Sequence, residues 1–271
     1  MTLPEPAVAL VTAVQQSRMI AAGAALAILW AIESVAPMYA GRRRRVSHGA
    51  ANLGLAALNA VVASAFAFAV VDVTERARVQ GFGLLHQLAV GPPARGVLAF
   101  LLVDGWQYWW HRANHRVSFL WRFHAVHHAD AELDVTSGVR FHTVEITLSF
   151  LARLAVLPLL GVTVPELVVY EAVALPVILF HHANLGIGPG LDGALRWLVV
   201  TPRMHYVHHS RLQPETDSNY ASLFSFWDRV FGSFRLRARP EEIALGLDAW
   251  REPEWRTLPG MLAAPFRRGR G

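Results

Sequence analysis

The sequence predicts an all-α integral membrane protein, with about four transmembrane helices in two hairpins and a cytosolic helical histidine-rich metal cap. Charged residues make up only 17% of the 271-residue chain, against about 25% in soluble domains, and the mean hydropathy is +0.32. Eleven of the thirteen histidines fall in the 99 residues from His111 to His209. The chain has no cysteine, which excludes disulfides, thiolate metal sites and cysteine nucleophiles.

Residues 1–94 are expected to form an N-terminal transmembrane hairpin and a linker. Met19–Ala40 is apolar except for Glu33 and Ser34, and Asn52–Val71 contains no charge, so each stretch is long enough to cross about 30 Å of hydrocarbon as a helix. The basic run Arg42–Arg45 lies between them, which places that loop in the cytoplasm. We expect no signal peptide and no nucleic-acid partner, although the net charge is +5.

The linker is followed by a third apolar stretch and then by a second hairpin. Within the linker, Gly83–Val90 is expected to form a short interfacial helix, and the apolar stretch Gly96–Trp110 then runs inward to an aromatic cytosolic end. The second hairpin is Thr143–Phe180, with its apex at Gly161–Pro165, where glycine and proline break the helix. Arg153 and Glu171 lie inside this hairpin, and at such depth we expect them to pair.

Helix lengths place three histidine-bearing segments at the same membrane face. His142 lies about twenty residues before the apex and His182 about eighteen after it, so both emerge roughly 27–30 Å away. His111 follows Arg95 by sixteen residues. Residues 236–271 are expected to be a basic cytosolic tail ending in Arg267, Arg268 and Arg270.

The histidine spacings are those of helical metal ligands. The sequence contains one HxxxH pair, two HxxHH boxes and one HH pair; in order, these are His111 and His115, His124, His127 and His128, His181 and His182, and His205, His208 and His209. Residues three or four apart share one helix face, so each box directs its rings at one point. Such geometry suits two metal ions a few ångströms apart.

Neutral imidazole binds iron, zinc, copper and nickel well, so the ligand type alone does not identify the metal. The number of ligands is more informative. Nine or ten histidines exceed one four-ligand zinc site, and the HExxH protease motif is absent. A dinuclear, nitrogen-rich site suits redox iron and dioxygen. A membrane zinc hydrolase, a non-enzymatic haem or metal-binding membrane protein, and a metal transporter remain alternatives.

Several polar residues near the boxes are candidates for orienting the ligands. Seven carboxylates near the boxes could accept a hydrogen bond from a ligand: Asp104, Asp130, Glu132, Asp134, Glu145, Asp217 and Asp228. We favour Asp104, two helical turns before His111, and Asp228 is a weaker choice. Asn114 and Asn184 could orient ligands or water, or form helix-end hydrogen bonds. We expect His48 and His86 to be structural, and a ligand role for His142 stays open.

At these boxes the sequence resembles the fatty acid hydroxylase / sterol desaturase superfamily of membrane di-iron, histidine-box oxygenases. It is most similar to the bacterial sterol-desaturase-like members and lies near alkylglycerol monooxygenase. Matching stretches lie between residues 95 and 235: DGWQYWWHRANH (104–115), LWRFHAVHH (120–128), RFH (140–142), FHHAN (180–184), PRMHYVHH (202–209) and NYASLFSFWDRVFGSF (219–234). The usual proline after the lone histidine is Thr143 here, which leaves the role of His142 in doubt.

The resemblance implies two iron ions and O₂-dependent hydroxylation or desaturation of a lipid, whether a sterol, a fatty acyl lipid or an alkyl lipid. It implies a four-helix membrane core under a cytosolic cap, with residues 95–235 as the catalytic domain. No cytochrome b5 domain is apparent, so a separate electron-donor protein is expected, and residue composition hints at a bacterial inner membrane. The implied metal ligands, with His181 as the least certain, are His111, His115, His124, His127, His128, His181, His182, His205, His208 and His209.

Overall fold

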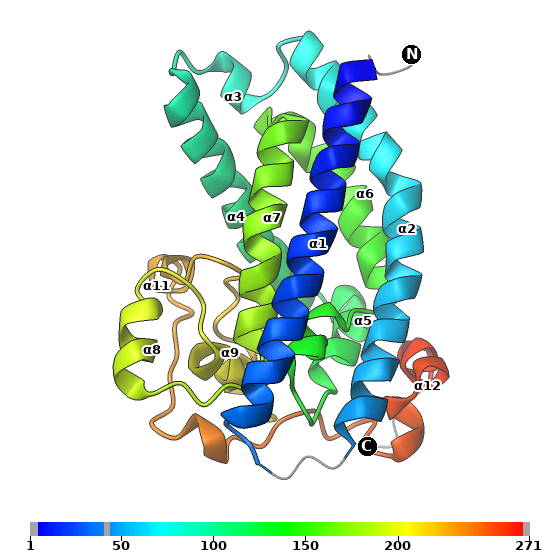
Figure 1. Ribbon diagram of the computed structural model, residues 1–271, viewed down its shortest axis with the longest axis vertical. Helices are drawn as coiled ribbons and strands as arrows, with labels where there is room; N and C mark the ends of the chain where they lie inside the picture. The colour runs from blue at the N-terminus through cyan, green and yellow to red at the C-terminus, as the bar shows by residue number, and fades with distance from the viewer. Residues whose placement is uncertain (1–4, 41–43, 268–271) are drawn as a thin grey trace.

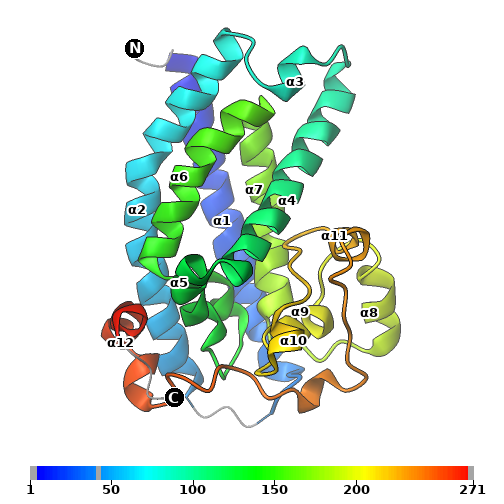
Figure 2. The same cartoon turned by 180° about the vertical axis from the view of Figure 1, so that it is seen from behind.

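The long axis of the molecule is set by a bundle of long helices. The computed structural model describes residues 5–40 and 44–267, which are helical with only isolated β-bridges and no strand within these ranges. The long helices of this described part lie side by side along the axis (Figures 1 and 2): α1 (Glu5–Val35), α2 (Arg45–Val79), α4 (Pro92–Arg116), α6 (Thr143–Leu160) and α7 (Val164–His182).

The bundle is that of a membrane protein. Within the described ranges, three helical stretches are long and apolar enough to cross a membrane, namely Arg45–Gln87, Thr143–Leu160 and Val164–His182. Met19–Val35 is apolar but shorter, and α1 ends at Val35 rather than at Ala40. The Arg42–Arg45 run that suggested the orientation lies partly outside the described residues.

The second predicted hairpin is confirmed, with its apex at the expected place. α6 ends where Gly161 adopts a left-handed conformation, with φ of 71°, and α7 begins after Thr163. The short helix α3 (Leu84–Gln87), predicted within Gly83–Val90, packs on this apex, where a Cβ on Gly83 would lie 2.2 Å from the carbonyl oxygen of Pro158. The expected pairing of Arg153 with Glu171 is also confirmed, at 2.6 Å.

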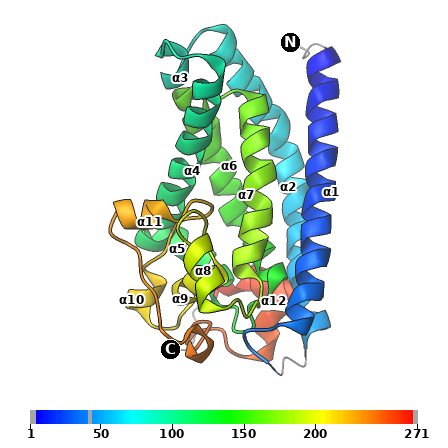
Figure 3. The ribbon, with the colours of Figure 1, turned by 60° about the vertical axis from the view of Figure 1, so that its left-hand side comes forward.

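A cap of short helices covers the end of the bundle opposite α3 (Figures 1 and 3). Prolines begin many of these helices, because the fixed φ of proline suits the first helical turn. The cap elements are α5 (Ser118–His128), Val135–Val139, α8 (Pro189–Leu195), α9 (Pro202–His208), α10 (Gln213–Thr216), α11 (Phe226–Val230), Pro240–Glu242, Pro253–Arg256, α12 (Leu258–Ala263) and Ala264–Phe266.

The C-terminal stretch does not leave the fold as a free tail, contrary to our expectation. Met261 and Ala264 are buried against Leu55 of α2 and Val126 of α5. Ile243 and Leu245 are buried in a second apolar cluster. The basic residues at the end of this stretch suggested a tail, and only the folded cap gives its apolar residues a surface on which to be buried. Arg268 and Arg270 lie outside the described residues.

Candidate metal centre

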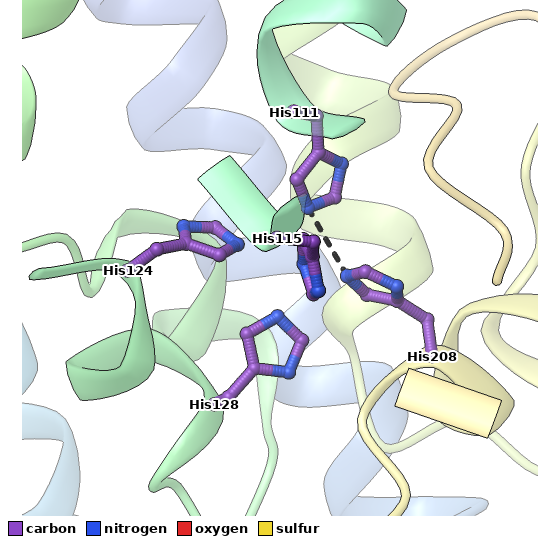
Figure 4. A group of neighbouring side chains, drawn as sticks. All are labelled: His111, His115, His124, His128 and His208. Atoms are coloured by element: carbon purple, nitrogen blue, oxygen red, sulfur yellow. Dashed lines mark hydrogen bonds between the residues drawn. The ribbon is translucent and has the colours of Figure 1, made fainter. Parts of the chain in front are cut away.

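Nine of the ten histidines implied as ligands converge in two adjacent clusters in the described part of the chain. In each cluster the nitrogen atoms that could bind a metal lie within 4.8 Å of one another. The first cluster, which Figure 4 shows with its rings turned toward a common centre, contains His111, His115, His124, His128 and His208; the second contains His127, His182, His205 and His209. His181 belongs to neither set, and its ring packs against His205 with 4.1 Å between centroids.

Each histidine box divides its members between the clusters in a regular way. Residues four apart stay together: His124 with His128 in the first cluster, and His205 with His209 in the second. The member three residues along, His127 or His208, enters the other cluster. Since successive residues turn by about 100° on a helix, i+4 and i+3 fall on opposite sides of residue i. One box can therefore supply two neighbouring sites.

Hydrogen bonds at Nδ1 fix the orientation of five rings. Each Nδ1 lies beside an oxygen acceptor, so it carries the proton, and the lone pair of Nε2 faces the cluster. The acceptors are the carbonyl oxygens of Tyr220 for His111 (2.7 Å), Arg140 for His127 (3.1 Å), Ile178 for His182 (2.7 Å) and Ser218 for His208 (2.6 Å), and the carboxylate of Glu145 for His124 (2.8 Å).

The Nε2 atoms consequently crowd together as acceptors without donors. The Nε2 atoms of His127 and His182 are 3.1 Å apart, and those of His111 and His208 are also 3.1 Å apart. Both members of each pair present lone pairs, which repel unless a cation lies between them. Two nitrogens bound at right angles to one metal, each about 2.1 Å from it, would be about 3.0 Å apart. The donor set therefore fits metal ions.

Burial keeps the rings in the state that binds metal. Burial lowers the pKa of His128 and of His205 well below the usual value, and it lowers the pKa of His208 to about 3. Neighbouring histidines add to the effect for His128 and His205, because a second positive charge in the same cluster is unfavourable. These rings are neutral at pH 7, as metal ligation requires.

The expectation that Asp104 orients His111 is wrong. Its carboxylate accepts hydrogen bonds from the Tyr170 hydroxyl (2.9 Å), the Phe224 backbone N–H (3.1 Å) and the Trp227 indole (2.8 Å). Two helical turns separate Asp104 from His111 by roughly 10 Å along the axis, beyond the reach of an aspartate. Two other carboxylates lie beside ligand candidates: Glu145 lies 2.8 Å from Nδ1 of His124, and Asp217 lies 3.6 Å from Nδ1 of His115. The place of Glu145 beside His124 depends on how α6 meets α5.

Asp228 reaches the first cluster indirectly. It accepts hydrogen bonds from the backbone N–H groups of Tyr220 (2.7 Å) and Ala221 (3.1 Å), and the carbonyl of Tyr220 in turn accepts from His111. Asn219 adopts a positive φ of 50°, and its side chain bonds the backbone of Met204 and Arg235. Asp228 and Asn219 thus fix the conformation of the loop whose carbonyl oxygens, at Tyr220 and Ser218, accept hydrogen bonds from His111 and His208.

The remaining candidates have structural contacts. Nδ1 of His142 accepts from the Val144 N–H (3.1 Å) and caps α6. Asn184 bonds the backbone of Tyr39 through both ends of its amide, whereas the side-chain oxygen of Asn114 is buried without a partner. His48 lies between Asp130 and Asp134, which agrees with a structural role.

Fold and site together define a helical membrane protein with a double histidine centre between its bundle and its cap. The chain belongs to the fatty acid hydroxylase family, whose pattern matches residues 96–233, about half of the chain. The superfamily expected from the histidine boxes is thereby confirmed. No solved structure matches the chain significantly.

Curated relatives are lipid-modifying enzymes. The chain is 31% identical over 175 residues to the ornithine lipid hydroxylase OlsE of Rhizobium tropici, which covers 64% of this chain and 51% of the relative. It is 31% identical over 189 residues to the alkylglycerol monooxygenase of Xenopus tropicalis, covering 68% of this chain and 41% of the relative. The matched part is thus about half the length of these relatives or less.

Proposed function

We propose that the protein is a membrane-bound non-haem di-iron oxidoreductase that uses O₂ to hydroxylate or desaturate a lipid. The observation that carries the proposal is the pair of buried clusters whose Nε2 lone pairs converge without donors. The two clusters are in direct contact, because the ring of His128 from the first stacks on the ring of His209 from the second, with 4.4 Å between centroids. Two metal sites this close suit a reaction that neither metal performs alone.

Each cluster would hold one iron. His111, His115, His124, His128 and His208 would bind the first, and His127, His182, His205 and His209 the second, with His181 packed beside His205. The irons, when bound, would supply O₂ activation for attack on an unreactive C–H bond. The chain's own contribution is to orient the rings through Glu145 and the backbone carbonyls, and to exclude bulk water by burial.

The substrate would be a lipid that enters from the bilayer. Gln107 lies one helical turn before His111 on the bundle side of the first cluster, and its side-chain oxygen is buried without a partner. This oxygen is placed to accept a hydrogen bond from a polar group near the reacting carbon. The relatives named for ornithine lipid and alkylglycerol support a polar lipid with a long chain.

We place the metal centre on the cytoplasmic side of a bacterial inner membrane, because the basic residues around Arg44 and Arg45 lie at the cap end. The four expected spans would be α1, α2, α6 and α7, with α4 as a further long helix that returns the chain from the α3 end to the cap. Residues 95–235 would be the catalytic unit. A separate protein would supply electrons.

The test compares lipids and metals in matched strains. Lipid extracts of a deletion strain, a strain carrying the wild-type chain and a His127→Ala strain would be compared by mass spectrometry. We expect one lipid class to gain an oxygen atom, or to lose two hydrogens, only with the wild-type chain. The purified protein should contain two irons. Two zinc ions and no iron after iron-replete expression would favour a hydrolase instead, and a Soret band would indicate haem.

A further inference from the structure

Part of the cap lies against the side of the bundle rather than beyond its end. We call it the side lobe and define it as residues 189–199 and 222–231, which include α8 and α11 (Figures 2 and 3). The backbone N–H of Phe224 and the indole of Trp227 both donate to Asp104 of α4. The ring of Phe224 also packs on Phe100, with 5.7 Å between centroids.

These contacts place the lobe at membrane depth. Asp104 is seven residues from His111 along α4, or roughly 10 Å. Its other partner, Tyr170, is twelve residues from His182 along α7, or roughly 18 Å, and α7 is one of the helices apolar enough to cross a membrane. The lobe therefore extends past the metal centre into the layer that the apolar part of α7 occupies.

The carboxylates of the lobe are buried, and its partly buried arginines bond to protein groups. Asp192 is fully buried and accepts from Arg196 and from the hydroxyl of Thr201. The guanidinium of Arg229 donates to the carbonyl oxygens of Ser225 (3.1 Å) and Arg196 (2.8 Å), and it lies 4.2 Å from the ring centroid of Phe234.

The irregular backbone of the lobe is also satisfied internally. Ser225 N–H donates to the Leu198 carbonyl (3.1 Å), and Val200 N–H donates to the Leu223 carbonyl (2.9 Å). Non-helical backbone is tolerated at membrane depth only when protein groups meet its hydrogen bonds. The lobe meets this condition where its two segments pair through an antiparallel β-bridge between Val199 and Phe224.

The outer surface of the lobe is apolar. Leu191, Trp197, Leu198 and Val230 are 57%, 74%, 59% and 64% exposed, respectively. A lobe surrounded by water would show the reverse arrangement, with charges outside and large apolar side chains inside. We infer that the side lobe is immersed in the bilayer leaflet next to the metal centre, with these side chains among the lipid acyl chains.

Continuity with the bundle identifies lipid as the occupant. The apolar outer surface adjoins α4 and α7 through Asp104, Phe100 and Tyr170, so the layer of lipid around α7 meets the lobe directly. A hydropathy window does not detect this region, because its helices are short and its sequence contains Asp192, Arg196 and Asp228. Folding buries the two carboxylates and pairs Arg196 with Asp192, which sequence composition alone does not reveal.

The absence of cysteine from the chain permits a direct test. Single-cysteine variants Leu198→Cys and Val230→Cys would carry an environment-sensitive fluorophore, in the metal-loaded protein, in vesicles of phosphatidylcholine and phosphatidylglycerol. Phe68→Cys, at an exposed apolar position of α2, is the control for lipid contact. Glu241→Cys, at an exposed position of the cap, is the control for water contact.

We expect nitroxide groups on the lipid acyl chains to quench the two lobe labels as they quench the Phe68→Cys label, about threefold more than the Glu241→Cys label. Iodide in the water should show the opposite order. Lobe labels that iodide quenches like the Glu241→Cys label would overturn the inference. Lobe labels that neither quencher reaches would also overturn it, because a protein contact would then cover the surface. If iodide quenches the Phe68→Cys label as well, membrane insertion itself is refuted.

Discussion

Replacing Glu145 by Ala is expected to weaken metal binding at the first cluster by roughly 10- to 100-fold. The carboxylate oxygen of Glu145 lies 2.8 Å from Nδ1 of His124, and both side chains are buried. A hydrogen bond to a charged group contributes roughly 1.5–3 kcal/mol, and about 1.4 kcal/mol corresponds to a tenfold change in affinity. The contact therefore accounts for one to two orders of magnitude, because without it the ring of His124 is free to turn and to change tautomer.

The assay is metal retention, which does not depend on a substrate. Purified wild-type and variant proteins would be dialysed against a graded series of chelator concentrations, and the metal that remains would be measured by mass spectrometry. Glu145→Gln keeps an oxygen acceptor and should recover part of the affinity. His142→Ala is the matched control, since His142 caps the same end of α6 but lies outside both clusters.

Two results would refute this reasoning. One is a Glu145→Ala protein that retains metal at the same chelator concentration as the wild type. The other is an equal loss in His142→Ala, which would show that any disturbance at the start of α6 releases metal and that the hydrogen bond to His124 has no particular effect.

Other perturbations test the second cluster, the buried histidines and the membrane ion pair. His127→Ala should reduce the metal content from two ions to one, because the first cluster keeps all its members; a protein without metal would contradict this. In metal-free protein, the folded state resists protonation of His208, whose pKa burial lowers to about 3. The unfolded state then binds more protons between pH 3 and 6.5, so stability should fall by roughly 2 kcal/mol for this residue between pH 7 and 5, seen as a lower unfolding temperature in detergent. Glu171→Ala should lower the yield of folded protein by leaving Arg153 unpaired, whereas the double variant Arg153→Met, Glu171→Leu should restore it; size-exclusion chromatography measures both.

Features set by local sequence could be predicted well. The apex of the second hairpin follows from Gly161 and from Pro165 after it, because a left-handed glycine and a proline at a helix start act within a few residues. The convergence of the histidines at one face followed from counting residues, at 1.5 Å each, along helices whose ends the sequence predicts. These arguments need no knowledge of which helices are neighbours.

Features that depend on neighbours could not be predicted. The choice between Asp104 and Glu145 required the packing of α6 on α5, and proximity in sequence favoured the wrong residue. The acceptors for most of the fixed rings are backbone carbonyls, which every residue possesses and which therefore leave no signal in sequence. The burial of Met261 against Leu55 likewise depends on a contact between residues 206 positions apart.

The side lobe and the metal centre share one segment of chain, which gives the lobe a role in shaping the site. The carbonyls of Ser218 and Tyr220 orient His208 and His111, and this segment continues directly into the lobe at residue 222. Asp228, inside the lobe, holds the Tyr220 N–H. A lobe embedded beside α4 would therefore fix two ligands of the first cluster relative to the bundle.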